Sequence, residues 1–270
     1  MAENLITNKS LSIRVCSNGL SFCTYAPGRE NPFEYKAWDV NHTISLTANL
    51  KDALMNEPTL RQECQRVNVL ISTPQFTTVP VSAFQKEDAE AIYRCVFPES
   101  APLHVSYNVL RRSGIAIVFG FDRSIYQLLL DDFPRARFYA SASTLIEFFS
   151  EKSLIGSGRK MYVYLHEKEM TLYAFEQGRM LFVNTFAATS VADIQYYTLN
   201  VWKELGFSQI DDNLSIVGDL EQRAAELSEK IKYFIQHVDI IDRSEDFKDR
   251  LTKGSSLIPY DLQTLLICGF

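Results

Sequence analysis

The chain of 270 residues is long enough for two domains of about 100–150 residues, each with its own core. Its hydrophobic content of 46% and charged content of 22% are ordinary globular values, which excludes a wholly disordered chain. The formal net charge of −6 disfavours a general binder of nucleic acid or of anionic membranes, because both need an excess of Lys and Arg.

The compartment can also be predicted from composition. Five cysteines without a Cys-x-x-Cys pair are typical of thiols in a reducing compartment. The N-terminal residues show no cationic segment followed by an apolar one, as a secretory signal would. The most continuous apolar stretch, 114–121, is far shorter than the roughly 20 residues that span a bilayer. We therefore expect a cytoplasmic protein without direct membrane insertion.

The first predicted elements form a three-stranded meander over residues 11–47. The segments LSIRVCS and LSFCTYA alternate in polarity on either side of Asn18-Gly19. This dipeptide favours a two-residue hairpin turn, because both positions tolerate positive φ. The third strand is predicted in the segment HTISLTA, which begins at His42. The predicted cross-strand pairs of the hairpin are Val15 with Phe22 and Ile13 with Thr24.

A helix and a buried strand are predicted after the meander. The helix covers 50–62, although Pro58 must shorten or kink it. The compact apolar run VNVLIS at 67–72 is suited to a buried parallel strand. Three strands, a helix and a strand are the beginning of an α/β lobe.

Residues 74–112 look like an insertion into this lobe. They add an extended segment, a helix with apolar residues at i, i+3, i+4 and i+7, and a further strand. Strand–helix alternation is predicted to resume with a second buried strand at 115–121. A helix capped by Ser124 and another strand–helix pair would then complete the lobe.

The second half of the chain repeats the order of the first. Residues 161–187 read as three strands and lead into a helix with a capping pair at Ser190 and Asp193. The strand NLSIVG, a helix with an apolar stripe, the strand HVDII and a short helix near 262–267 follow. The segment EKSLIGSGRK separates the two halves. The predicted lobes are residues 1–155, which include the insertion, and residues 156–270.

Two copies of the order β-β-β-α-β-α-β-α resemble the actin-like ATPase superfamily, whose lobes have a ribonuclease H-like fold. The segment YVYLHEKEMTLYAFEQGRMLFVNTFA is similar to the second meander of the pilus-assembly PilM proteins and of the cytoplasmic part of the type II secretion protein GspL. NLSIVGDLEQ resembles their second-lobe strand that leads to a glycine. The whole chain also resembles an uncharacterised family from Bacteroidetes with this fold. The resemblance implies a duplicated α/β protein of two lobes with a cleft between them.

The resemblance also indicates where a nucleotide would bind. The superfamily has an Asp-x-Gly loop in each meander, where backbone N–H groups approach phosphate and the Asp organises a metal-bound water. The first loop aligns with Arg14 in the place of Asp and Cys16 in the place of Gly. The second loop aligns with Tyr164 and His166 in these two places. Neither loop keeps the residues that the chemistry requires.

A third place, a Gly-Gly turn that holds the adenosine, aligns with Gly218 and Asp219, and the Asp219 carboxylate would repel an anionic nucleotide. Loss of all three motifs argues against ATP hydrolysis, and we predict no catalytic residue, no cofactor and no metal. The candidate cleft-binding residues are Arg14, Cys16, Ser17, Asn18, Tyr164, His166, Glu167, Gly218 and Asp219.

Three functions stay open at this stage. The first is a catalytically silent scaffold that binds a protein partner through the insertion or the cleft. The second is a divergent ATPase or kinase that uses ATP and Mg²⁺, with the polar residues of the first loop on phosphate and Asp219 or Glu167 on metal. The third is a sensor that binds a small acidic metabolite through Arg14.

Two further pairs of residues have a structural explanation. His166 and Glu167 are adjacent in a strand and point to opposite faces, so we expect a polar turn rather than an acid–base or metal site. Cys16 and Cys23 lie on neighbouring predicted strands, with no base or helix N-terminus beside them. We expect packed thiols rather than nucleophiles.

Paired acids could chelate a metal, but both pairs flank predicted helix or strand ends. We therefore expect Asp131-Asp132 and Asp211-Asp212 to be solvated surface acids. Arg111-Arg112 is expected to form a solvated turn between two strands. The remaining histidines, which match no metal-ligand spacing, are His42, His104 and His237.

Overall fold

The computed structural model describes residues 9–17, 19–27, 32–98, 103–218, 221–242, 246–247 and 258–268. The chain divides into two compact units. The first comprises Met1–Ser143 and Asp249–Ile258, and the second comprises Thr144–Lys248 and Pro259–Phe270. Each unit contains a five-stranded sheet, and the first also contains a three-stranded sheet.

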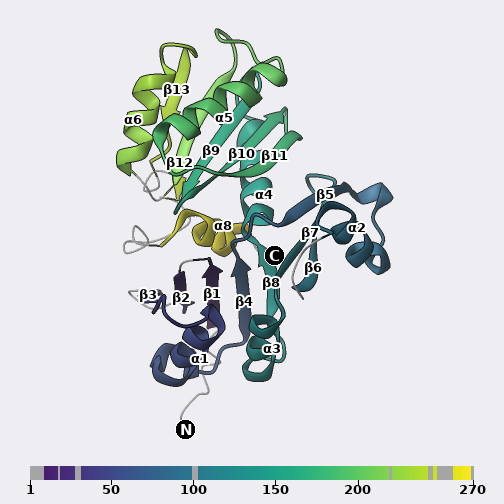
Figure 1. Ribbon diagram of the computed structural model, residues 1–270, viewed down its shortest axis with the longest axis vertical. Coiled ribbons are helices and arrows are strands. Elements are labelled where there is room, and N and C mark those ends of the chain that lie inside the picture. The colour runs from purple at the N-terminus through teal and green to yellow at the C-terminus, as the bar shows by residue number, and fades with distance from the viewer. Residues whose placement is uncertain are drawn as a thin grey trace. The chain divides into compact units, whose positions relative to one another are not determined.

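The main sheet of the first unit has the strand order β3-β2-β1-β4-β8 (Figure 1). The central strand β1 is antiparallel to β2 and parallel to β4, and β4 is parallel to β8. A meander followed by parallel strands therefore forms one mixed sheet. Its strands are β1 (Ser10–Cys16), β2 (Gly19–Tyr25), β3 (Phe33–Trp38), β4 (Arg66–Ile71) and β8 (Arg137–Ala140).

The first hairpin forms, but its predicted register is wrong by two residues. Cys16 pairs with Gly19 and Ile13 with Phe22, so Gly19 belongs to β2 and not to the turn. Because side chains alternate with a period of two, this shift leaves every side chain on its predicted face. Asn18 lies outside the described residues.

The third strand and the first helix also differ from the prediction. The third strand is β3, and the segment that begins at His42 leads into the helix α1 (Leu46–Asn56). The hydroxyl of Ser45 accepts a hydrogen bond from the Ala48 N–H and caps this helix. The helix does not extend over 50–62, because Pro58 begins a separate 3₁₀ turn, η1 (Pro58–Arg61).

The insertion forms an antiparallel sheet of its own, with the order β5-β7-β6. The strand predicted at 115–121 is β7, so its placement in the main sheet is wrong. A fully buried central strand has the same apolar run in either kind of sheet, and pattern alone cannot distinguish them. The elements are β5 (Phe76–Pro80), η2 (Val81–Ala83), η3 (Lys86–Asp88), α2 (Ala89–Val96), β6 (Leu103–Leu110) and β7 (Ile115–Asp122).

Asn108 of β6 connects this small sheet to the main sheet. Its Oδ1 accepts hydrogen bonds from the Ala140 N–H at 2.9 Å and the Ser143 hydroxyl at 2.7 Å. Its Nδ2 donates to the Phe138 carbonyl at 2.8 Å. The amide thus joins β6 to β8 and to the first turn of α4 (Ser141–Ser153).

The helix α3 (Arg123–Asp132) follows β7 directly. Its cap is Asp122 and not the predicted Ser124. The Asp122 carboxylate accepts from the Ser124 N–H at 2.6 Å and from the Ile125 N–H at 3.4 Å. A carboxylate at this position satisfies two of the unpaired N–H groups at the helix start.

The sheet of the second unit has the order β11-β10-β9-β12-β13, which repeats the arrangement in the first unit. His166 pairs with Glu169 as Cys16 pairs with Gly19, so both hairpins have two-residue turns 150 positions apart. The predicted duplicated α/β fold is confirmed. The strands are β9 (Lys160–His166), β10 (Glu169–Glu176), β11 (Arg179–Ala187), β12 (Asn213–Gly218) and β13 (His237–Ile240).

Helices cover both faces of this second sheet. On one face, α5 (Val191–Glu204) and α6 (Glu221–Ile231) bury an apolar core. On the other face lie α4 and α8 (Tyr260–Cys268). The ring of Phe149 in α4 stacks on Tyr162 with centroids 4.2 Å apart, and the ring centroids of Tyr260 and Tyr164 are 6.3 Å apart. Because helices cover both faces of the sheet, β9 is buried and its residues are apolar along most of its length.

The helix ends of the second unit match the prediction in part. Ser190 and Asp193 form the predicted capping box of α5. The helix α6 ends at Ile231, and Phe234 beyond it is 46% exposed. Asp219, just before this helix, lies outside the described residues. No helix in the described ranges is long and apolar enough to cross a membrane.

Candidate functional site

The first candidate loop is the turn between β1 and β2. Arg14 and Cys16 are two residues apart on the same face of β1, and both are buried. Arg14 Nη1 donates to Cys16 Sγ at 3.1 Å, and the thiol donates to the Gly19 carbonyl at 3.1 Å. Ser17 is exposed in the turn. A buried guanidinium therefore lies where the actin-like resemblance places an aspartate.

Two serines share this face with Arg14. Ser12 is two residues earlier on β1, and Ser21 is the cross-strand partner of Arg14 on β2. Both are buried, and their hydroxyls have no hydrogen-bond partner within the described part of the chain. Buried hydroxyls are normally paired, so this face is polar and incompletely satisfied.

The second candidate loop is the turn between β9 and β10. Tyr164 and His166 are both buried, and their rings stack with centroids 4.9 Å apart. His166 Nε2 lies 3.2 Å from Thr171 Oγ1, which is 2.8 Å from Thr185 Oγ1. A hydrogen-bonded row of side chains therefore crosses three strands from β9 to β11.

Glu167 lies in the turn itself, with φ at 50°. Its carbonyl accepts a hydrogen bond from Arg223 Nη1 at 3.1 Å. Burial, together with the Glu167 carboxylate, raises the pKa of Glu169 across the turn. The predicted polar turn is correct for Glu167 and wrong for His166, which is the buried last residue of β9.

Gly218 ends β12 beside Leu165 of β9. Its φ is 145°, and a Cβ at this position would lie 2.1 Å from the Leu165 carbonyl oxygen. No side chain fits at that distance. The close approach of two backbones within the sheet is a sufficient reason for glycine here.

The acid pairs differ from each other. Asp131 and Asp132 are exposed at the end of α3, as predicted. Asp212 is 4% exposed, which corrects the prediction of a surface acid. Its carboxylate accepts from Arg159 Nη2 at 2.8 Å and from the Ser208 N–H at 2.7 Å. This buried ion pair ties the start of β9 to the loop before β12.

The remaining candidates from the sequence, which are cysteines and histidines, do not gather into a metal site in the described residues. No group of three His, Cys, Asp or Glu side chains gathers at one place in the ranges that the structure describes. Burial raises the pKa of the Cys23 thiol to about 12, so it stays protonated at neutral pH. His104 stacks on Tyr126, and His42 and His237 are exposed.

The candidate residues thus form two separate groups, one in each unit. Arg14, Cys16 and Ser17 gather at the first hairpin, and the second unit places its candidates at the carboxyl ends of β9 and β12. Asn18 and Asp219 are not described. Four polar neighbours of these groups were not among the predicted site residues, although all are alternate polar residues in predicted strands. They are Ser12, Ser21, Thr171 and Thr185.

The fold and the paired hairpins define the class of protein. A crystal structure from Bacteroides thetaiotaomicron, of a protein with actin-like ATPase fold and unknown function, is 33% identical over 99% of both chains, with a TM-score of 0.83. A chain of the PilM–PilN type IV pilus biogenesis complex is similar over 96% of this chain and 98% of its own, with a TM-score of 0.57 and 9% identity. That second likeness shows the fold alone. This is a protein of the actin-like ATPase fold.

Within this class, the chain belongs to the family described as Protein of unknown function (DUF3822), which matches residues 3–238. No curated protein matches the chain. The resemblance to the actin-like superfamily that the repeated pattern indicated is confirmed.

Proposed function

We propose that this protein is a non-catalytic actin-like binding or scaffold protein of the cytoplasm, with another protein as its partner. The observation that carries the proposal is the stack of Tyr164 and His166 in the second hairpin. Two buried rings stand where the actin-like ATPases place Asp and Gly. Neither ring can orient a metal-bound water as a carboxylate does.

The first hairpin supports the same conclusion. A phosphate loop needs backbone N–H groups that a glycine leaves accessible. Cys16 instead places a thiol there, which bonds to the Gly19 carbonyl. Arg14 supplies a positive charge in place of the carboxylate. Because the close contact with Leu165 already explains Gly218, no bound adenosine is needed to account for that glycine.

The first experiment is a thermal-shift titration of the full chain with ATP and ADP, each with and without Mg²⁺. A catalytically competent actin-like ATPase serves as the positive control. We expect no saturable stabilisation up to about 5 mM nucleotide, because only a ligand that prefers the native state raises stability. Saturable stabilisation with Mg²⁺-dependent hydrolysis, lost in Glu167→Gln or Asp219→Ala, would instead support the divergent ATPase or kinase.

The partner is proposed to bind the inserted subdomain, now defined by its sheet as residues 76–122. Large apolar side chains on this subdomain are exposed to solvent, and such groups are typical of protein interfaces. They are Val81, Val96, Tyr107 and Val109, between 36% and 51% exposed.

A photo-crosslinking amino acid at Tyr107 tests this placement in cells of the source organism. We expect a discrete crosslinked adduct with one protein. The matched control is the same substitution at Tyr233, which is 87% exposed in the other unit. Equal adducts at both positions, or none at Tyr107, would contradict the role of the insertion.

A second candidate function is a sensor of a small acidic metabolite. It is favoured by the two unsatisfied hydroxyls, Ser12 and Ser21, on the same face as the buried Arg14. A thermal-shift panel of small dicarboxylates and inorganic phosphate tests it. Stabilisation that Arg14→Gln abolishes would support the sensor, and unchanged stabilisation in that variant would exclude Arg14 as its receptor.

A further inference from the structure

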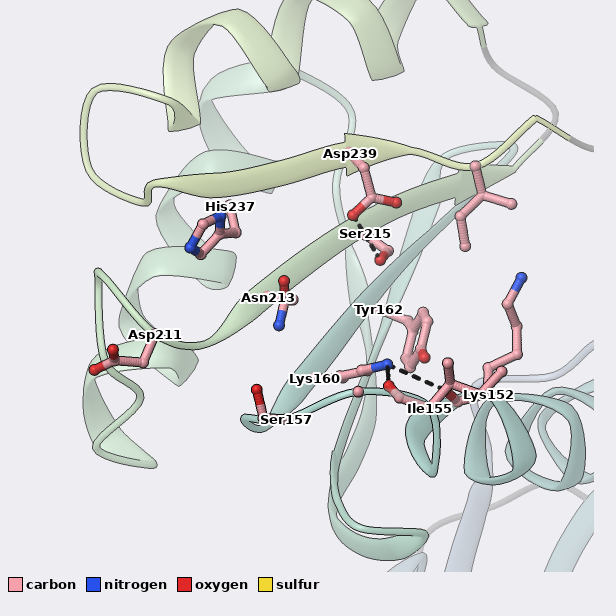
Figure 2. A pocket seen from close by; sticks show the side chains of 12 residues that line it. Lys152, Ile155, Ser157, Lys160, Tyr162, Asp211, Asn213, Ser215, His237 and Asp239 are labelled. Carbon is pink, nitrogen blue, oxygen red and sulfur yellow. Dashed lines mark hydrogen bonds between the residues drawn. The ribbon is translucent and has the colours of Figure 1, made fainter.

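The second unit contains a pocket that none of the candidate residues lines. It has a volume of about 510 Å³ and lies at the amino ends of β9, β12 and β13, beside the end of α4 (Figure 2). Small-molecule sites usually have volumes of about 300–1,000 Å³. Lys160 in the pocket and His166 in the hairpin are six residues apart on β9, or roughly 20 Å along an extended strand. The pocket is therefore distinct from the candidate residues at the hairpin.

The floor of the pocket is built by strand register. The three neighbouring strands are parallel, so residues paired across them form rows on one face of the sheet. All six residues of two adjacent rows line the pocket. The first row is Lys160, Asn213 and His237, and the second row is Tyr162, Ser215 and Asp239.

Opposite charges lie on opposite sides of this floor. Asp239 projects from β13 on one side, and Lys152 and Lys160 are on the other (Figure 2). Asp239 Oδ1 accepts a hydrogen bond from the Ser215 hydroxyl at 3.0 Å. No residue in the described ranges bonds to its second oxygen, Oδ2, which leaves an acceptor for a ligand.

The ammonium groups also keep donors for a ligand. Lys160 Nζ donates to the Lys152 carbonyl at 3.2 Å and to the Ile155 carbonyl. Lys152 Nζ forms an ion pair with Asp246. Each ammonium has three N–H donors, so at least one remains on each lysine.

This arrangement of groups excludes several classes of ligand. A multiply charged anion would meet the Asp239 and Asp211 carboxylates, and a polyamine would meet the two lysines. A sugar usually stacks on an open aromatic face. The Tyr162 ring already stacks on Phe149, with centroids 4.2 Å apart and 6° between the planes.

We propose that the pocket binds a small zwitterion, a free amino acid or a dipeptide, with its ammonium at Asp239 and its carboxylate at Lys152 and Lys160. Such a ligand carries one positive and one negative charge on a small framework and has no net charge. It matches the two charged sides of the pocket at once. The proposal is independent of the scaffold function and of the two hairpins.

The electrostatics of the pocket support this complementarity. Burial lowers the pKa of Lys160, which favours its neutral form. Although Asp239 keeps contact with water, partial burial raises the pKa of its carboxyl. A ligand that brings an opposite charge to each group offsets both effects.

Isothermal titration calorimetry of the full chain with alanine and with alanyl-alanine tests the proposal. The N-acetylated dipeptide and the C-terminal amide are measured alongside, because each lacks one charge. We expect saturable binding of at least one zwitterion and at least about tenfold weaker binding of both blocked forms. Asp239→Asn should weaken binding of the zwitterion by a similar factor, since it keeps the shape and the Ser215 contact but removes the charge.

The control variant is Asp131→Asn, an exposed acid of the other unit, which should bind as the wild type does. Thermal melting of both variants checks that they are folded. No saturable binding of either probe up to about 10 mM would overturn the proposal. Equal binding of a blocked form, or unchanged affinity in Asp239→Asn, would overturn it as well.

Discussion

At the residue scale, the places where an actin-like ATPase holds its nucleotide are filled by groups with other partners. The Arg14 guanidinium bonds to a thiol, and the Tyr164 ring stacks on His166. Gly218 is determined by the carbonyl of Leu165. A glycine that the fold family uses for ligand access is here required by the sheet itself.

The first prediction concerns this glycine. Gly218→Ala should lower the free energy of unfolding by about 2–4 kcal/mol, because the new Cβ clashes with the Leu165 carbonyl in a strained conformation. Denaturant unfolding measures the change. The control is Gly156→Ala, which also has positive φ but meets nothing within 4 Å. Gly156→Ala should lower the free energy of unfolding by only about 1 kcal/mol. An equal loss of stability in both variants would contradict the predicted clash at Gly218.

The second prediction concerns the pH dependence of stability through His104. Burial, reinforced by Arg123 and opposed by Glu90, lowers the pKa of this imidazole below its ordinary 6.5. The unfolded chain therefore takes up the proton first, and the contribution to stability is lost as the pH falls below 6.5.

An NMR titration should show His104 titrating below 6.5, and Arg123→Gln should raise its pKa. The variant His104→Phe should unfold with a smaller loss of stability between about pH 7 and pH 5 than the wild type. A titration of His104 above 6.5 would contradict a lowering of its pKa by burial and by Arg123.

At the scale of elements, a buried side-chain amide of the inserted sheet forms hydrogen bonds to the main sheet of the first unit. The side chain of Asn108 bonds to backbone groups of β8 and to the Ser143 hydroxyl in α4. Buried amides of this kind fix the position of an element, because each lost bond leaves a partner unsatisfied.

The third prediction follows from this connection. Asn108→Ala should lower the free energy of unfolding by about 2–3 kcal/mol, because it leaves the Ala140 N–H and the Phe138 carbonyl unpaired. Hydrogen exchange should speed up in β8 more than in α2. The control Asn56→Ala, an exposed residue that bonds only to Asp52, should change stability by less than about 0.5 kcal/mol. An equal loss of stability in the two variants would contradict a role of Asn108 in joining the two sheets.

At the scale of the whole molecule, the two units share one architecture, whereas the residues at the two hairpins differ from those that the actin-like resemblance implies. Both units carry the same sheet order, and the likeness to the Bacteroides protein covers 99% of both chains. A fold alone does not assign a function, since the chemistry belongs to particular residues. The proposed roles therefore depend on the hairpins, the insertion and the pocket.

The fourth prediction follows from the net charge of −6. Neither duplex DNA nor single-stranded RNA should bind at about 100 mM salt, because binding would require clustered Lys and Arg to release counterions. Fluorescence anisotropy with labelled oligonucleotides measures this. Micromolar binding that weakens steeply with salt would reveal a basic surface that the overall charge conceals.

The order of the elements, and the kind of most of them, could be predicted from the sequence. Apolar periodicity, the Ser190–Asp193 cap and the repeated meander are local signals, and they predicted a duplicated α/β fold correctly. The resemblance to the actin-like superfamily then identified the fold. The faces of the first hairpin were also predictable, because an error of two residues in register leaves them unchanged.

The three-dimensional structure shows which elements and side chains meet. It placed β7 in a separate sheet, buried Asp212 against Arg159, and aligned the rows of Lys160 and Tyr162 into a pocket floor. The physical reason is that a residue pattern specifies which face is buried but not which partner buries it. Such pairings depend on contacts between residues far apart in the chain, for which a local pattern carries no information.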